Sequence, residues 1–72
     1  MGEFAQEVAV EWRERISVDP GVCHGKACVR GTRVLISVLL DNLAAGETID
    51  GIARDYHVSP DDVRAALLYA AS

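Results

Sequence analysis

The chain has 72 residues, half of them hydrophobic, and a formal net charge of −4. A chain of this size forms one domain with a small core, and such domains often complete their burial by forming oligomers. Its longest uncharged apolar runs, 34–40 and 65–71, have seven residues each, whereas a membrane-spanning helix needs about 20. The acidic start of the chain also lacks the basic and apolar regions of a signal peptide. We therefore expect a cytoplasmic protein without a membrane partner.

The charge is unevenly distributed along the chain. Residues 1–11 carry a net charge of −3, residues 12–33 carry +3, and residues 34–72 carry −4. The overall acidity argues against nonspecific binding of nucleic acid, because such binding depends on neutralising phosphates. The basic middle segment remains compatible with a specific contact to an anionic partner.

The N-terminal part of the chain fits more than one structure. Phe4, Val8 and Trp12 recur every four residues, which suits a helix, whereas Val8–Val10 equally suits an extended strand. Residues 15–18 alternate polar and apolar side chains, which predicts a short strand ended by the Asp-Pro-Gly turn that follows it.

Three helices are predicted in the rest of the chain. Residues 34–36 precede the first helix and suit either a second strand or the lead-in to that helix. Apolar residues then recur at intervals of three and four, which places them on one face of each helix. The three predicted inner faces are Ile36, Leu39, Leu40 and Leu43; Ile49, Ile52, Ala53 and Tyr56; and Val63, Ala66, Leu67 and Ala70.

Capping residues mark the predicted helix ends. Ser37 is expected to cap the start of the first helix, and Gly46 to take the left-handed conformation at its end. Thr48 is expected to cap the second helix, and Ser59, followed by proline and two acids, the third. Gly51 lies inside the second helix at a cost of about 1 kcal/mol relative to alanine, which suggests a close approach between helices.

Only His57–Ser59 separate the second and third helices, which predicts a helix-turn-helix arrangement. We expect Ala53, Val58 and Val63 to pack where these helices meet. His57 stands where many such turns have glycine, so we expect it to have a positive φ.

The predicted fold class is mainly α: a three-helix, homeodomain-like helix-turn-helix domain over residues 15–72, preceded by a short β segment, with an N-terminal extension over 1–14. A DNA-reading helix needs basic or amide side chains, but Arg64 is the only base on the third helix. After Arg64 this helix is apolar nearly all round, which indicates contact with a second subunit or partner. Leu68 and Tyr69 are its predicted interface residues.

Residues 22–35 form a basic loop and are the main candidate binding site. The loop carries Lys26, Arg30 and Arg33 and no acid. We predict that these bases, with Arg64, bind an anionic group of a partner or a phosphate. Alternatively, the loop bases form ion pairs that hold the loop on the helices, as most surface charges have no binding role. The acids available for such pairs are Asp19, Asp41 and Asp55.

Two glycine-containing turns are expected to shape this loop. Gly25 and Gly31 can adopt backbone conformations closed to other residues, and Thr32 belongs to the second turn. Together they would present the three basic side chains side by side.

The cysteines and histidines do not form a recognisable metal or catalytic motif. Cys23, His24 and Cys28, with the distant His57, lack the paired spacings of structural zinc sites. A Cys-His catalytic pair needs a cleft and a third orienting group, which a domain of this size rarely provides. We therefore expect no metal, no cofactor and no enzymatic activity, and reduced thiols as the default.

Several motifs together resemble a known bacterial family. The most specific is Gly25-Lys-x-Cys-x-x-Gly-Thr-Arg33, and the others are Trp12–Ile16, Asp19-Pro20, Leu40–Gly46, Tyr56 and Asp62–Ala70. From Trp12 onward the chain is thereby similar to the family catalogued as domain of unknown function 433.

This resemblance implies a usually dimeric helix-turn-helix domain preceded by a short β segment. Members are often encoded beside a PIN-like ribonuclease and look like antitoxins of type II toxin-antitoxin pairs. We therefore expect a homodimeric, antitoxin-like regulatory protein that binds a PIN-like ribonuclease toxin, with operator DNA as a further candidate partner. The alternative is a dimeric protein-interaction scaffold with no DNA role. No catalytic residues follow from the resemblance.

Overall fold

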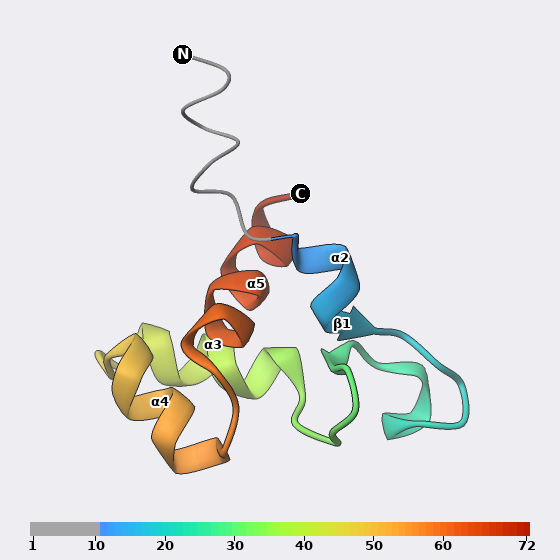
Figure 1. Cartoon of the computed structure of the whole chain (residues 1–72), viewed down its shortest axis with the longest axis horizontal. Helices are drawn as coiled ribbons and strands as arrows, with labels where there is room; N and C mark the ends of the chain where they lie inside the picture. The colour runs from blue at the N-terminus through green and yellow to red at the C-terminus, as the bar shows by residue number, and fades with distance from the viewer. Residues whose placement is uncertain (1–10) are drawn as a thin grey trace.

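The structure, a computed structural model, describes residues 11–72 and is mainly helical, as predicted (Figure 1). The helix-or-strand alternative at Phe4–Val10 lies outside these residues. The elements in chain order are α2 (Trp12–Arg15), β1 (Ile16–Ser17), a 3₁₀ turn η1 (Cys23–Gly25), β2 (Cys28–Val29), α3 (Ile36–Ala44), α4 (Ile49–Tyr56) and α5 (Pro60–Ala71).

The two strands form a small antiparallel sheet. Ile16 pairs with Val29, and Ser17 with Cys28. The predicted strand at 15–18 is therefore present but short. Its partner is β2. Of the two alternatives for residues 34–36, the lead-in to the first helix is the one found, and Leu35 makes only an isolated bridge to Cys28.

Helix α3 begins one residue before the predicted cap. Its N-cap is Leu35, which makes no side-chain capping bond, so the expected capping role of Ser37 is wrong. The amide of Ile36 instead donates to the carbonyl of Ala27 at 3.0 Å, so the β2 segment supplies a partner for a free helix N-terminal group. At the other end Gly46 has a φ of 96°, as expected.

Helices α4 and α5 form the predicted helix-turn-helix. His57 has φ 59° and ψ 41° and ends α4 in the left-handed conformation. The amide of Val58 then donates to the carbonyl of Ala53 at 3.0 Å, which closes the turn.

Gly51 serves the cap of α4 rather than a contact between helices. The hydroxyl of Thr48 accepts a hydrogen bond from the Gly51 amide at 3.0 Å. A Cβ on Gly51 would lie 3.0 Å from that same oxygen. The expected close approach of helices at Gly51 is therefore wrong, because the atom nearest to it belongs to its own cap.

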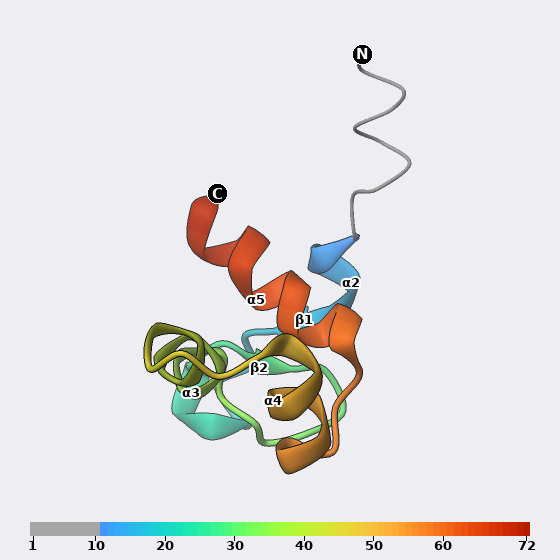
Figure 2. The ribbon, with the colours of Figure 1, turned by 90° about the vertical axis from the view of Figure 1, so that its left-hand side faces the viewer.

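Helix α2 lies beside α5, far from it in sequence (Figures 1 and 2). The rings of Trp12 and Tyr69 meet edge to face with their centroids 5.7 Å apart. Arg15 binds the carboxylate of Asp62 at 3.1 Å, and Asp62 with Ser59 forms the capping box at the start of α5. The start and the end of the described chain are therefore joined directly.

The core lies where α3, α4 and the first half of α5 meet the small sheet. Its buried side chains are Ile16, Cys28, Val29, Ile36, Leu39, Ile52, Ala53, Val63, Ala65 and Ala66. The inner face predicted for α5 is partly wrong, because Leu67 and Ala70 are exposed and Ala65 is buried. The first half of α5 is covered on several sides, whereas its second half extends beyond the body of the molecule (Figure 2).

His57 offers a test of the helix-turn-helix turn. A non-glycine residue in the left-handed conformation costs about 1 kcal/mol or more, and the His57 side chain is exposed. We expect His57→Gly to raise the free energy of unfolding by up to about 1 kcal/mol, measured by urea denaturation. His57→Ala is the matched control and should bring no gain. Destabilisation by glycine would show that the imidazole itself supports the turn.

Candidate functional site

The predicted basic loop begins with an unusual left-handed turn. Cys23, His24 and Gly25 have φ values of 52°, 56° and 80°. The turn is closed by the amide of Gly25 donating to the carbonyl of Val22 and that of Lys26 donating to Cys23, both at 3.1 Å. The sequence predicted a positive φ at the glycine, but gave no signal for the two residues before it.

The second turn of the loop is built around Gly31 and Thr32. Gly31 has a φ of 82°, and the amide of Thr32 donates to the carbonyl of Val29 at 3.0 Å. The Thr32 hydroxyl also donates to that carbonyl at 2.8 Å and accepts from the amide of Val34 at 3.0 Å. Thr32 thus ties together both sides of the turn.

Arg30 is directed at the main chain of α2 and β1. Its guanidinium donates to the carbonyls of Glu14 at 2.8 Å and Ile16 at 3.0 Å, with a longer bond of 3.4 Å to Arg13. The last carbonyls of a helix have no partner within it, so Arg30 caps α2. The alternative that a loop base holds the loop on the helices is therefore found for Arg30. Its acceptors are main-chain carbonyls and not the expected carboxylates.

The other predicted basic residues lie apart from one another. Lys26 borders one surface groove, and Arg33 borders a different hollow together with Ser17 and Thr32. Arg64 pairs with Asp61 on the same helix at 2.9 Å. Of the three loop bases, Arg30 is thus bound to main-chain carbonyls, while Lys26 and Arg33 border different hollows.

The expected ion pairs of the loop bases are also not found in residues 11–72. Asp19, Asp41 and Asp55 form no ion pair there. The ion pairs in this part of the chain are Arg13–Glu11, Arg15–Asp61, Arg15–Asp62 and Arg64–Asp61.

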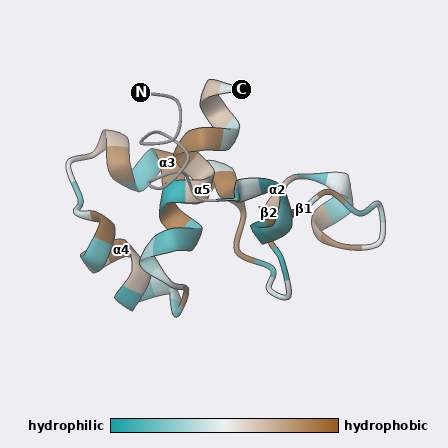
Figure 3. Ribbon diagram, turned by 45° about the horizontal axis from the view of Figure 1, so that its top comes forward, coloured by the Kyte–Doolittle hydropathy of each residue, from teal (hydrophilic) through white to brown (hydrophobic). Residues whose placement is uncertain are grey.

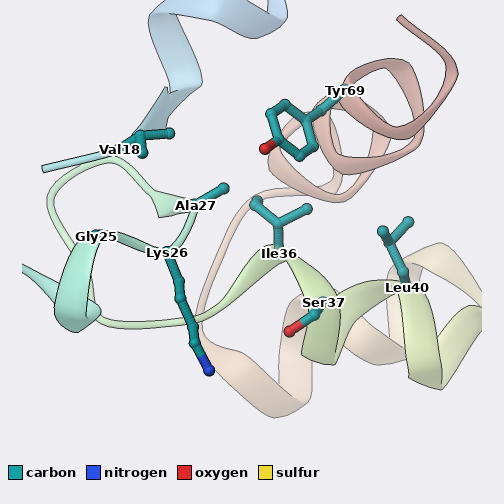
Figure 4. Close-up of a pocket in the computed structure, with 8 residues that line it drawn as sticks. All are labelled: Val18, Gly25, Lys26, Ala27, Ile36, Ser37, Leu40 and Tyr69. Atoms are coloured by element: carbon teal, nitrogen blue, oxygen red, sulfur yellow. The ribbon is translucent and has the colours of Figure 1, made fainter.

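A groove lies between the loop, α3 and α5 (Figure 4). It is open to solvent and has a volume of about 480 Å³. Tyr69 overhangs the groove from α5, above Ala27 and Ile36, while the Lys26 side chain leads away along its rim (Figure 4). The complete lining is Val18, Gly25, Lys26, Ala27, Ile36, Ser37, Leu40 and Tyr69.

An exposed apolar surface adjoins this groove. Val18 is 59% exposed, and Leu67, Leu68 and Tyr69 on α5 are 42%, 36% and 36% exposed. Val18 and Tyr69 belong to both the surface and the groove. Figure 3 shows the hydrophobic colouring on the part of α5 that extends towards the C-terminus. The predicted interface residues Leu68 and Tyr69 are both accessible, whereas Val18 was missed because its neighbours come from distant parts of the chain.

The two cysteines occupy different environments. Cys28 is fully buried, and its thiol lies 3.5 Å from the hydroxyl of Ser17. Cys23 is half-buried and its thiol donates to the carbonyl of Arg33 at 3.5 Å. Partial burial, followed by the neighbouring Cys28, raises the pKa of the Cys23 thiol, and the positive charge of Arg33 opposes this shift. Cys23 is therefore mainly protonated at neutral pH.

No three histidine, cysteine or acidic residues gather in residues 11–72 as a metal centre would require. None of the helices in this part of the chain is both long and apolar enough to cross a membrane.

Arg30 can be tested as a cap of α2. Arg30→Ala removes three donors to main-chain carbonyls and should lower the free energy of unfolding by about 1–2 kcal/mol, since these bonds are charge-assisted but exposed. Arg33→Ala is the matched control, because its side chain makes no hydrogen bond or ion pair in residues 11–72. Urea denaturation of both variants measures the difference. Equal stabilities would refute the capping role.

Comparison with known proteins identifies the family. The family model described as protein of unknown function (DUF433) matches residues 16–70. The chain is similar to the crystal structure of Rv2018 from Mycobacterium tuberculosis, with 33% identity and a TM-score of 0.69 over 79% of this chain and 27% of that one. It is also similar to a DUF433 member protein from Anabaena variabilis, with 26% identity and a TM-score of 0.70 over 93% of this chain and 63% of that one.

The chain thus spans less than two thirds of the length of both similar structures. No curated protein is significantly similar to it. The family match and the shared helix-turn-helix fold agree with the motifs of the loop and helices. The chain belongs to the DUF433 family of proteins of unknown function.

Proposed function

We propose that this protein is an antitoxin-like regulatory module that binds a protein partner, a PIN-like ribonuclease toxin, through the groove between the loop, α3 and α5. The observation that carries this proposal is the mainly apolar lining of the groove, part of which is exposed. Val18 and Tyr69 line the groove and are 59% and 36% exposed. Apolar side chains gathered beside a groove are typical of protein interaction sites.

The polar and apolar groups at the groove indicate which chemical groups the partner segment should carry. The walls are mainly apolar, and Lys26 contributes a positive charge at the rim. A partner segment with an apolar side chain next to a carboxylate fits this arrangement, since the carboxylate would pair with Lys26. A PIN-type active site is an acidic metal cluster, so acidic groups are available on the proposed toxin.

The groove is proposed to bind rather than catalyse. Its polar side chains, Lys26, Ser37 and Tyr69, form no hydrogen bond with one another. A serine nucleophile needs an adjacent base to activate it. Binding without chemistry is what this set of groups supports.

Operator DNA is a further proposed partner, supported by the helix-turn-helix arrangement of α4 and α5. Against it, the first turn of α5 carries Asp61 and Asp62, which would face phosphates. Arg64, the one base on α5, is already paired with Asp61. DNA binding, if present, would then depend on Arg54 of α4, and Arg54→Ala should abolish it in a mobility-shift measurement.

The partner proposal is tested by co-expression with a PIN-like ribonuclease encoded next to the gene. We expect the two proteins to co-purify, and Val18→Glu to weaken the complex because it places a charge at the apolar groove. Val18 is 59% exposed, so the variant should fold normally by circular dichroism. Asp50→Lys on α4 is the control and should leave binding unchanged. Undiminished binding by Val18→Glu would exclude the groove, and absence of co-purification would exclude this partner.

We also infer that the protein forms a homodimer through the second half of α5. Its apolar residues exceed what the small core covers, and Leu68 is 36% exposed. Leu68→Glu should therefore give a folded monomer, because a buried charge without a partner opposes association. Light scattering at micromolar concentration measures the mass of both proteins, with Arg54→Glu as the control. A monomeric wild-type protein would contradict the inference.

A further inference from the structure

The two cysteines bracket one wall of the groove. Cys23 lies in the left-handed turn η1, and Cys28 lies in β2. Between them, Gly25, Lys26 and Ala27 line the groove opposite Tyr69 (Figure 4). A covalent bond between the two cysteines would therefore act directly on this wall.

The two thiols lie at the same part of the molecule. The Cys28 thiol contacts the hydroxyl of Ser17, and the Cys23 thiol donates to the carbonyl of Arg33. Ser17 and Arg33 in turn border a single hollow, which is also lined by Val22, the residue before the 3₁₀ turn. The main chain agrees with this placement, since Cys28 pairs with Ser17 on one side and with Leu35, two residues beyond Arg33, on the other.

The backbone at Cys23 is held in a costly conformation. A cysteine at φ 52° followed by a histidine at φ 56° is rare outside glycine-rich turns. Such conformations persist where the surrounding structure determines them, and they gather at functional positions. Here the turn follows Val22 and places the Cys23 thiol 3.5 Å from the carbonyl of Arg33.

We propose that Cys23 and Cys28 are a reversible dithiol–disulfide pair, and that their disulfide fixes the groove wall between them and so alters partner binding. The second part rests on the proposed function, whereas the first does not. Both cysteines are free in this structure, which is its reduced form.

The reaction with a small disulfide such as oxidised glutathione is balanced. The Cys23 thiol is the more accessible, so its thiolate attacks one sulfur of the reagent, breaks the sulfur–sulfur bond and releases one glutathione thiolate. Cys28 then loses its proton and attacks the Cys23 sulfur, which forms the internal bond and releases the second glutathione. Two protein thiols are oxidised, and one molecule of oxidised glutathione is reduced to two thiols.

The rate of this exchange should depend on pH. The attacking species is the thiolate, and the pKa of Cys23 is raised, so less thiolate is present at neutral pH than in an ordinary cysteine. We expect oxidation to accelerate as pH rises through and above neutrality.

Intact-mass measurement after treatment with oxidised glutathione tests the first part. The wild-type monomer should lose two hydrogen atoms, and digestion without reductant should yield a peptide linked from Cys23 to Cys28. Cys28→Ser should instead accumulate a mixed disulfide with glutathione on Cys23. Cys23→Ser should stay unmodified while folded, because Cys28 is buried. Two free thiols in the treated wild type, or links only between chains, would overturn the pair.

Partner binding tests the second part separately. We expect the oxidised and reduced wild-type proteins to differ in Kd for the toxin by about fivefold or more, and the Cys23→Ser, Cys28→Ser double variant to show no change on oxidation. Equal affinities with the disulfide present would overturn the effect on the groove and leave the disulfide standing. If neither form binds the toxin, the proposed function fails. The groove is then followed by NMR, where unchanged Ala27 and Tyr69 signals on oxidation would overturn its coupling to the disulfide.

Discussion

The carboxylate of Asp62 joins the two ends of the described chain. One of its oxygens accepts from the amide of Ser59 and closes the capping box of α5, while the other accepts from Arg15 at 3.1 Å. A four-residue helix such as α2 has no stability of its own, because helix nucleation is unfavourable. It forms because Arg15 anchors it to α5 and Trp12 packs against Tyr69. The position of Tyr69, and with it one side of the groove, therefore depends on this contact.

The loop motif from Gly25 to Arg33 contains some residues with a structural role and others whose role is unassigned. Arg30 holds the loop to the carbonyls of α2, and Gly31 with Thr32 closes the turn that follows. Lys26 and Arg33 are directed elsewhere and border two different hollows. A basic motif in a sequence therefore does not always form one charged patch on the surface. One of its side chains, here Arg30, can instead donate its hydrogen bonds to main-chain carbonyls.

Local patterns predicted the helices well. Thr48 and Ser59 cap α4 and α5, and His57 takes the left-handed conformation, because each of these features depends on a few adjacent residues. Ser37 is not the cap of α3, because the helix already begins at Ile36. The amide of Ile36 donates to the carbonyl of Ala27, which lies outside the helix. Contacts of this kind come from tertiary structure, and no local pattern signals them.

The groove could not be predicted for the same reason. Val18 follows the first strand, Leu40 lies in α3 and Tyr69 in α5, and only folding brings them together. Leu67 and Ala65 exchanged their expected environments because α5 is covered on several sides in its first half and uncovered in its second. Helical periodicity identifies apolar faces, but it does not say which other element covers them.

The bond between Arg15 and Asp62 spans 47 residues of sequence, and this separation has a consequence for how the chain folds. During synthesis α2 leaves the ribosome before its anchoring partner in α5 has been translated. Closing so long a loop is entropically costly before the intervening helices have packed. The nascent chain should therefore hold α3 and α4 together while its N-terminal helix stays undocked, and the apolar surface of Trp12 remains exposed to chaperones until α5 has formed.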